Sequence, residues 1–242
     1  MRILSLGDST TYGVGVESDQ TYSAFLEGML NDQSCRAEVI NAGVPSYTSE
    51  QGVAALRLRW QFYRPDLITT YFGNNDSSRV LTRPDRELAA VPSPLSFLSG
   101  LLERSRVYLC MQGIALQRID RSLLVPRVSQ EDYRDSLIQI EDLAKRFGAK
   151  VWHLRPVTHT EDAFYDGGYS LDLAFLPLRA AFTRSGKRPV ELFVDGVHPS
   201  VEGHRVIAKY LFSRLRAEGF LEDCEQGGGA ESDAAPLSAP ER

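Results

Sequence analysis

Short apolar runs of β type alternate with stretches of helical periodicity along most of this chain. The runs are typical of buried strands and lie at 2–6, 38–41, 66–72 and 150–154. Apolar residues recur at helical spacing in segments around 22–30, 53–62, 131–147 and 204–216. A helix that connects two strands lets the second strand run parallel to the first. The alternation therefore predicts an α/β domain with a mostly parallel sheet.

Two segments depart from the alternation. Residues 77–130 contain proline-rich turns and helical apolar patches at 95–102 and 106–119, so we expect a helical insertion that forms a lid or a pocket wall. Residues 222–242 consist largely of Gly, Ala, Ser, Pro and acidic residues, which predicts a disordered acidic tail. The chain has 242 residues, and we expect a single domain over 1–221.

The formal net charge of −5 comes from that tail. Its six acidic residues and one arginine account for the whole value, which leaves the body of the chain neutral. Binding to nucleic acid requires clustered Lys and Arg side chains that neutralise phosphates. A neutral body therefore predicts no nucleic-acid partner.

The three cysteines are widely spaced, and no two of them form a CxxC pair: Cys35, Cys110 and Cys224. An odd, scattered set disfavours a disulfide framework and a zinc site. No signal-peptide pattern precedes the first strand, and no run reaches the ~18 apolar residues of a membrane span. We therefore expect a cytoplasmic protein with no membrane span.

Polar and small residues gather where the predicted strands end. Gly7-Asp8-Ser9 follows the first strand, Asn41-Ala42-Gly43 closes the second, and Gly73-Asn74-Asn75-Asp76 follows the third. Asp195-Gly196-Val197-His198-Pro199 precedes the last predicted helix. Ligands of an open parallel sheet bind at the carboxyl ends of its strands, so these blocks predict a site at that edge.

The residue types in these blocks suit acyl transfer. Ser9 is a candidate nucleophile, His198 can act as its base, and Asp195 can fold back onto the imidazole from the same turn. A tetrahedral intermediate also needs hydrogen-bond donors for its oxyanion. The Ser9 backbone N–H, the Gly43 backbone N–H and the Asn75 amide can supply them.

Together the four blocks closely resemble those of the SGNH hydrolases, also called the GDSL esterase/lipase family. Gly7-Asp8-Ser9 resembles the nucleophile block, Gly43 the glycine block, Asn75 the asparagine of GxND, and Asp195 to Pro199 the DxxHP block. The resemblance covers about residues 1–215. It implies a three-layer α/β/α sandwich with a flavodoxin-like sheet, no metal and no cofactor. It also implies the catalytic and oxyanion roles given above.

Other interpretations of single residues stay open at this point. Ser9 could be only a helix cap, since serine is a favoured capping residue. The glycines at 13 and 15 complete neither GxGxxG nor GxxxxGK[ST], so a phosphate-binding loop is disfavoured. His153 and His159 lie near Glu161 and Asp162, but their spacing matches no recognised metal site, and we expect the His159 loop to line the pocket rim.

The expected function is hydrolysis of a short acyl or acetyl ester by a serine esterase. The substrate class is a small-molecule or carbohydrate ester. An O-acyltransferase could use the same residues, and a binding module could keep the fold without catalysis. The sequence does not indicate the oligomeric state.

Overall fold

The structure is a computed structural model, and it describes residues 1–80, 84–85 and 124–222. The helices expected at 95–102 and 106–119 lie outside these ranges, as does almost all of the predicted tail.

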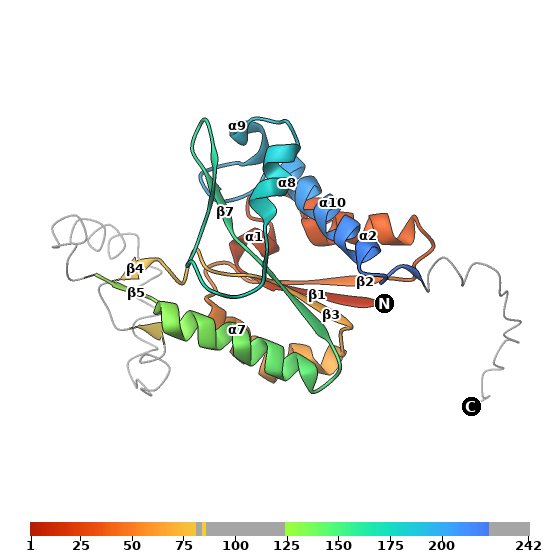
Figure 1. Cartoon of the computed structure of the whole chain (residues 1–242), viewed down its shortest axis with the longest axis horizontal. Helices are drawn as coiled ribbons and strands as arrows, with labels where there is room; N and C mark the ends of the chain where they lie inside the picture. Colours follow the sequence, from red (N-terminus) through yellow and green to blue (C-terminus); the bar gives the residue numbers. More distant parts are fainter. Residues whose placement is uncertain (81–83, 86–123, 223–242) are drawn as a thin grey trace, which may run out of the picture.

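A five-stranded parallel sheet forms the centre of the molecule (Figure 1). Its strands, in spatial order, are β2 (Glu38–Gly43), β1 (Arg2–Gly7), β3 (Leu67–Tyr71), β6 (Lys150–Leu154) and β9 (Phe175–Leu176). Numbered by appearance in the chain, this is the order 2-1-3-4-5 of flavodoxin-like folds. The predicted α/β class and flavodoxin-like sheet are confirmed.

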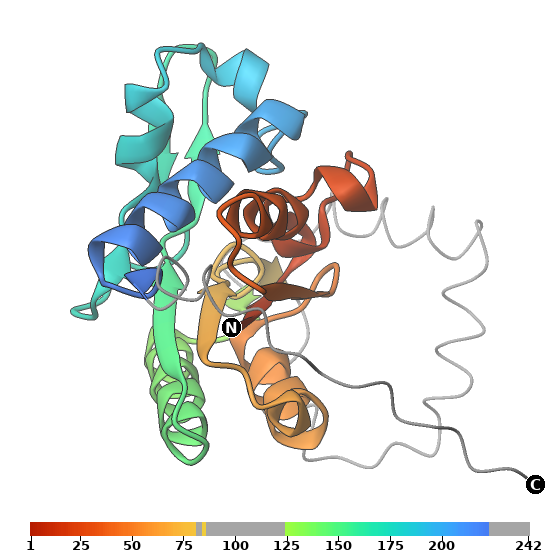
Figure 2. The same ribbon diagram turned by 90° about the vertical axis from the view of Figure 1, so that its right-hand side faces the viewer.

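Helices cover both faces of the sheet, as Figure 2 shows. On one face lie α2 (Tyr22–Asn31), α8 (Leu178–Arg184) and α10 (Val201–Ala217), whereas α3 (Ser49–Leu58) and α7 (Gln130–Lys145) lie on the other. Side chains of a strand alternate between the two faces. Ile3 accordingly packs with the α2 and α10 cluster, and Leu4 and Leu6 pack with the α3 and α7 cluster.

Several short elements were not expected from the sequence. They are the helices α1 (Ser9–Tyr12) and α9 (Pro189–Leu192), the 3₁₀ turns Ser18–Gln20 and Trp60–Tyr63, and two small antiparallel pairs. The pairs are β4 (Arg79–Val80) with β5 (Val125–Pro126), and β7 (Val157–His159) with β8 (Phe164–Asp166). Each is too short to show a clear periodicity, yet α1, α9 and β7 carry or adjoin the site residues.

Cys35 is buried in the core and is disulfide-bonded, contrary to what three scattered cysteines suggested. Within the ranges that the structure describes, no helix is both long enough and apolar enough to cross a bilayer.

Candidate active site

Ser9 is the first residue of α1, directly beyond the carboxyl end of β1. The cap of this helix is Asp8 and not Ser9: an Asp8 carboxylate oxygen accepts the Thr10 N–H at 2.9 Å. Asp8 has extended backbone angles, as capping residues do. The capping interpretation of Ser9 is therefore wrong, and its hydroxyl is available for another partner.

Two glycines let α1 lie directly against the strand ends. A Cβ on Gly43 would stand 2.1 Å from the Tyr12 backbone nitrogen, and a Cβ on Gly7 would stand 2.0 Å from the Thr11 hydroxyl. Real Cβ atoms do not approach other atoms this closely. Gly7 and Gly43 therefore set the close packing that places Ser9 at the edge of the sheet.

The structure brings Ser9, His198 and Asp195 into one hydrogen-bonded chain. His198 Nε2 lies 2.8 Å from Ser9 Oγ, and His198 Nδ1 lies 2.7 Å from Asp195 Oδ2. A carboxylate can only accept, so the bond to Asp195 places the proton of the neutral imidazole on Nδ1. Nε2 is then the acceptor for the Ser9 hydroxyl, as a general base requires.

The turn from Asp195 to His198 orients the carboxylate. Asp195 Oδ1 accepts the backbone N–H groups of Val197 and His198, at 2.8 and 2.7 Å. Partial desolvation acts to raise the pKa of Asp195, but the hydrogen bonds from the His198 ring and from these two N–H groups outweigh it. The net effect lowers the pKa, which keeps Asp195 ionised beside the imidazole.

His159, which the sequence placed only at the pocket rim, supports this turn from β7. Its Nε2 lies 2.6 Å from the Asp195 carbonyl oxygen, and its backbone N–H donates to the Gly196 carbonyl at 3.2 Å. Its ring packs on Phe193 with the centroids 4.8 Å apart. Sequence reasoning could not find this role because the acceptors are backbone carbonyls 36 and 37 positions away.

The three expected oxyanion donors differ in their partners. The Ser9 N–H belongs to the first turn of α1, where N–H groups lack intrahelical acceptors. The Gly43 N–H donates to Asn41 Oδ1 at 3.0 Å. The Asn75 amide donates to the Tyr47 carbonyl at 3.1 Å and to Asp8 Oδ2 at 3.4 Å. Two of the three donors thus have acceptors from the protein itself.

Two buried carboxyls lie behind the site. Burial raises the pKa of Asp8 to about 7, with nearby Asp76 adding to the effect and the Thr10 N–H opposing it. Burial also raises the pKa of Asp76, whose Oδ1 accepts both the N–H and the hydroxyl of Ser49, at 2.9 and 2.6 Å. Asp76 therefore fastens the loop that carries Asn75 to the first turn of α3.

The remaining histidines are structural. His153 is buried between Thr70 and Glu141, at 2.8 and 3.2 Å, and burial lowers its pKa although Glu141 opposes the shift. His204 packs against Tyr22, accepts the Tyr22 N–H at 3.1 Å, and has its pKa lowered by burial to about 4. In the described ranges, no three His, Cys, Asp or Glu side chains gather in a way that could hold a metal ion.

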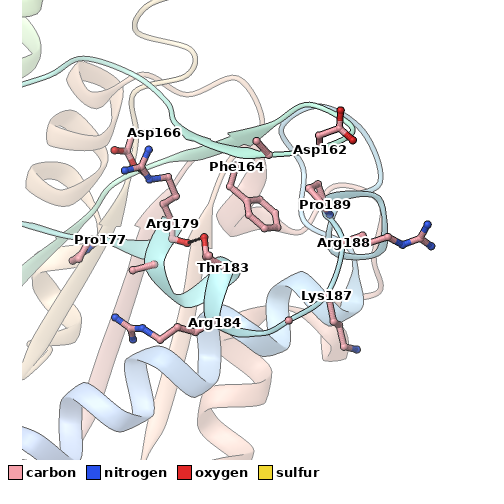
Figure 3. A pocket seen from close by; sticks show the side chains of 13 residues that line it. Asp162, Phe164, Asp166, Pro177, Arg179, Thr183, Arg184, Lys187, Arg188 and Pro189 are labelled. Atoms are coloured by element: carbon pink, nitrogen blue, oxygen red, sulfur yellow. Dashed lines mark hydrogen bonds and ion pairs between the residues drawn. The ribbon is translucent and has the colours of Figure 1, made fainter.

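A groove of about 810 Å³ lies away from Ser9, between the β7–β8 hairpin, α8 and α9 (Figure 3). Three of its four basic side chains are engaged in ion pairs: Arg179 with Asp166, Lys187 with Glu202, and Arg188 with Glu191. Figure 3 shows the Arg184, Lys187 and Arg188 side chains pointing in different directions. The groove contains no side chain of the Ser9 site, so we do not assign the substrate to it.

Comparison with known proteins gives the family. A model of the GDSL-like lipase/acylhydrolase family matches residues 5–206. Over 77 residues the chain is 31% identical to esterase TesA of Pseudomonas aeruginosa, a match that covers 32% of this chain and 38% of that protein. The match thus spans well under half the length of this relative.

Solved structures of low sequence identity share the fold. A crystal structure of TesA covers 90% of this chain and 99% of its own, with a TM-score of 0.55 and 16% identity. Axe2, an acetylxylan esterase from Geobacillus stearothermophilus, covers 90% and 94%, with a TM-score of 0.55 and 18% identity. Since the family model matches most of the chain, the protein belongs to the GDSL-like lipase/acylhydrolase (SGNH) family.

Proposed function

We propose that the protein is a serine esterase that hydrolyses a short acyl or acetyl ester of a small molecule or carbohydrate. The observation that carries the proposal is the chain of hydrogen bonds from Ser9 Oγ through His198 to Asp195, at 2.8 and 2.7 Å. Nucleophile, base and orienting acid are thus within reach of one another before substrate binds.

Acylation uses these three side chains in turn. Ser9 Oγ attacks the ester carbonyl carbon as His198 Nε2 takes the hydroxyl proton, and Asp195 stabilises the imidazolium that results. The tetrahedral intermediate collapses by breaking the bond to the alcohol oxygen. His198 returns the proton to that oxygen, which leaves as the alcohol, and the acyl group stays on Ser9.

Deacylation repeats the sequence with water. His198 takes a proton from the attacking water, and the second intermediate releases the carboxylic acid and restores the Ser9 hydroxyl. In both intermediates the Ser9 N–H, the Gly43 N–H and the Asn75 amide hold the oxyanion. For this role the Gly43 N–H must leave Asn41, and the Asn75 amide must give up either Tyr47 or Asp8.

The preference for short acyl or acetyl groups rests on similarity. Axe2, which has this fold, is an acetylxylan esterase, and the relative in Pseudomonas aeruginosa is an esterase. A graded panel of p-nitrophenyl esters and acetylated sugars tests the preference. A rate that rises steadily with acyl chain length would contradict it.

Substitution of the nucleophile tests the esterase proposal itself. Ser9→Ala is expected to lower kcat on p-nitrophenyl acetate by about a thousandfold or more, because attack through an acyl-serine is lost. Ser213→Ala on α10 serves as the matched control and should keep the parent rate, since Ser213 bonds only its own helix at Tyr210. Equal rates for Ser9→Ala and the parent would contradict the assignment.

Product analysis separates hydrolysis from transfer. With a sugar added as the acyl acceptor, a hydrolase yields the free acid in proportion to the ester consumed. Acyl sugar as the main product would contradict hydrolysis while leaving the acyl-serine intermediate intact.

A further inference from the structure

The segment 57–64, with sequence Arg-Leu-Arg-Trp-Gln-Phe-Tyr-Arg, is unusually apolar for a surface. It spans the end of α3 and the 3₁₀ turn that follows. Leu58 is 76% exposed and Phe62 is 74% exposed, and Tyr63 is 41% exposed. Single exposed apolar residues need no explanation, but several in one short segment mark a surface that binds something.

The same segment carries three exposed arginines and no acidic residue: Arg57, Arg59 and Arg64. Among the described residues none of the three forms an ion pair with an acid; Arg57 donates to Gln139 at 3.3 Å, and Arg59 lies over the Trp60 ring at 4.5 Å. Of the neighbouring acids, Glu38 pairs with the Arg2 guanidinium at 2.8 Å, and Asp66 accepts the Arg2 backbone N–H at 2.6 Å. The segment therefore presents three arginine side chains, with no ion pair to a described acid, around its apolar side chains.

We propose that segment 57–64 docks the protein on an anionic lipid surface. Leu58 and Phe62 enter the apolar boundary of the bilayer, and Trp60 and Tyr63, whose rings lie 5.4 Å apart, take the headgroup level that amphipathic rings prefer. The three arginines bind lipid phosphates. This mode of binding needs no membrane-spanning helix.

A second copy of the chain suits this surface less well. In a twofold dimer the same patch meets itself, which would set three arginines against three arginines. Like charges that face each other across an interface are strongly unfavourable. Uncompensated positive charge instead complements a surface of anionic headgroups.

The segment lies at the amino ends of the parallel strands, whereas the candidate active site lies at their carboxyl ends. The Tyr63 carbonyl accepts a hydrogen bond from the Arg2 guanidinium at the start of β1, whereas Ser9 follows the end of that strand. A six-residue strand is about 20 Å long. Docking through segment 57–64 therefore leaves the Ser9 edge facing away from the membrane and open to substrate.

Vesicle co-sedimentation of the full chain tests the proposal. The parent should bind vesicles of phosphatidylcholine mixed with phosphatidylglycerol, and it should bind phosphatidylcholine alone much more weakly. Each arginine is expected to contribute about fivefold to this affinity, so Arg57→Gln/Arg59→Gln/Arg64→Gln should weaken it about a hundredfold. Leu58→Ser/Phe62→Ser should retain attraction at low salt and lose the binding that resists added salt.

Two further variants serve as controls. Arg179→Gln/Arg184→Gln/Arg188→Gln removes the same charge from the groove of Figure 3 and should bind within about twofold of the parent. Arg57→Lys/Arg59→Lys/Arg64→Lys keeps the charge and should retain most of the affinity. Thermal unfolding of each variant establishes that it is folded.

Three results would overturn the proposal. The first is equal binding of the parent to both kinds of vesicle, or to neither. The second is equal vesicle binding by the arginine-to-glutamine variant of segment 57–64 and the arginine-to-glutamine variant of the groove. The third is a parent dimer in light scattering that Leu58→Ser/Phe62→Ser converts to monomer, because the segment would then be an interface between copies. Ser9→Ala should bind vesicles like the parent, so this test is independent of the esterase proposal.

Discussion

His159 shows how a residue remote in sequence can position a side chain of the candidate active site. Its ring and its backbone hold the carbonyls of Asp195 and Gly196, the turn that aims the carboxylate at His198. We infer that His159 is a positioning residue, since it contacts the turn and none of the reacting atoms. Its loss should loosen the turn without removing any catalytic group.

Replacing that ring tests the positioning role. His159→Phe keeps the contact with Phe193 but removes the hydrogen bond to Asp195, so kcat on p-nitrophenyl acetate should fall about tenfold. His159→Gln keeps a side-chain donor and should recover part of the rate, with KM little changed in both. An unchanged kcat in His159→Phe would contradict the role.

Asp8 ties stability to pH. Burial raises the pKa of Asp8 from 3.8 to about 7 in the folded protein, so the native state holds this proton to a higher pH than the unfolded chain does. The Asp8 contribution to the free energy of unfolding is therefore most favourable below pH 3.8 and is lost as the pH rises to about 7. Each unit of the shift corresponds to about 1.4 kcal/mol.

Asp8→Asn isolates this contribution, because asparagine still accepts the Thr10 N–H. In urea unfolding, the free energy of unfolding of the parent should fall by a few kcal/mol relative to that of Asp8→Asn as the pH rises from about 4 to about 7. Asp162→Asn, which replaces an exposed acid in the β7–β8 loop, is the control for the loss of one carboxyl group. A parent-to-variant difference that stays constant over this range would contradict the assignment.

At the scale of elements, the close contact between α1 and β2 fixes the position of Ser9 at the carboxyl ends of the strands. Gly43→Ala would force a Cβ to 2.1 Å from the Tyr12 nitrogen, so α1 must move. We expect a loss of about 1–3 kcal/mol in the free energy of unfolding, with a larger loss of activity because Ser9 moves with the helix.

Gly28→Ala is the matched control for that change. Gly28 lies in α2, where an added Cβ would meet no atom within 4 Å. The control should be more stable by about 0.5–1 kcal/mol, because alanine favours helix more than glycine does. If Gly43→Ala were as stable and active as Gly28→Ala, the close approach would not matter.

The elements also show what could be predicted from sequence. The strands β1, β3 and β6 can be predicted because each is largely a buried apolar run, and four of the larger helices because one face of each is apolar. The strand β2 is shorter in apolar residues and only partly buried, but its β-branched Val39 and Ile40 precede the small residues that end it. The edge strand β9 has only two residues and α1 only four, which is too few for any period to show. The candidate site residues can be proposed from sequence because Ser9, Asn75, Asp195 and His198 stand in recognisable blocks.

At the scale of the whole molecule, Cys35 is buried in the core and is disulfide-bonded. A disulfide stabilises mainly by restricting the unfolded chain. Adding dithiothreitol before urea unfolding should therefore lower the free energy of unfolding by about 2–4 kcal/mol. Cys35→Ser should be insensitive to the reductant, and a parent that is equally insensitive would contradict the bond.

The hydrogen-bond partners of the oxyanion donors affect how well the site distinguishes a neutral carbonyl oxygen from an anionic one. Gly43 and Asn75 already donate to Asn41, Tyr47 and Asp8, so a neutral substrate carbonyl gains little by displacing these acceptors. A full negative charge forms much stronger hydrogen bonds and can displace them. On the proposed mechanism, these existing hydrogen bonds weaken the binding of the neutral substrate carbonyl. The donors then stabilise chiefly the transition state, in which the oxygen has become anionic.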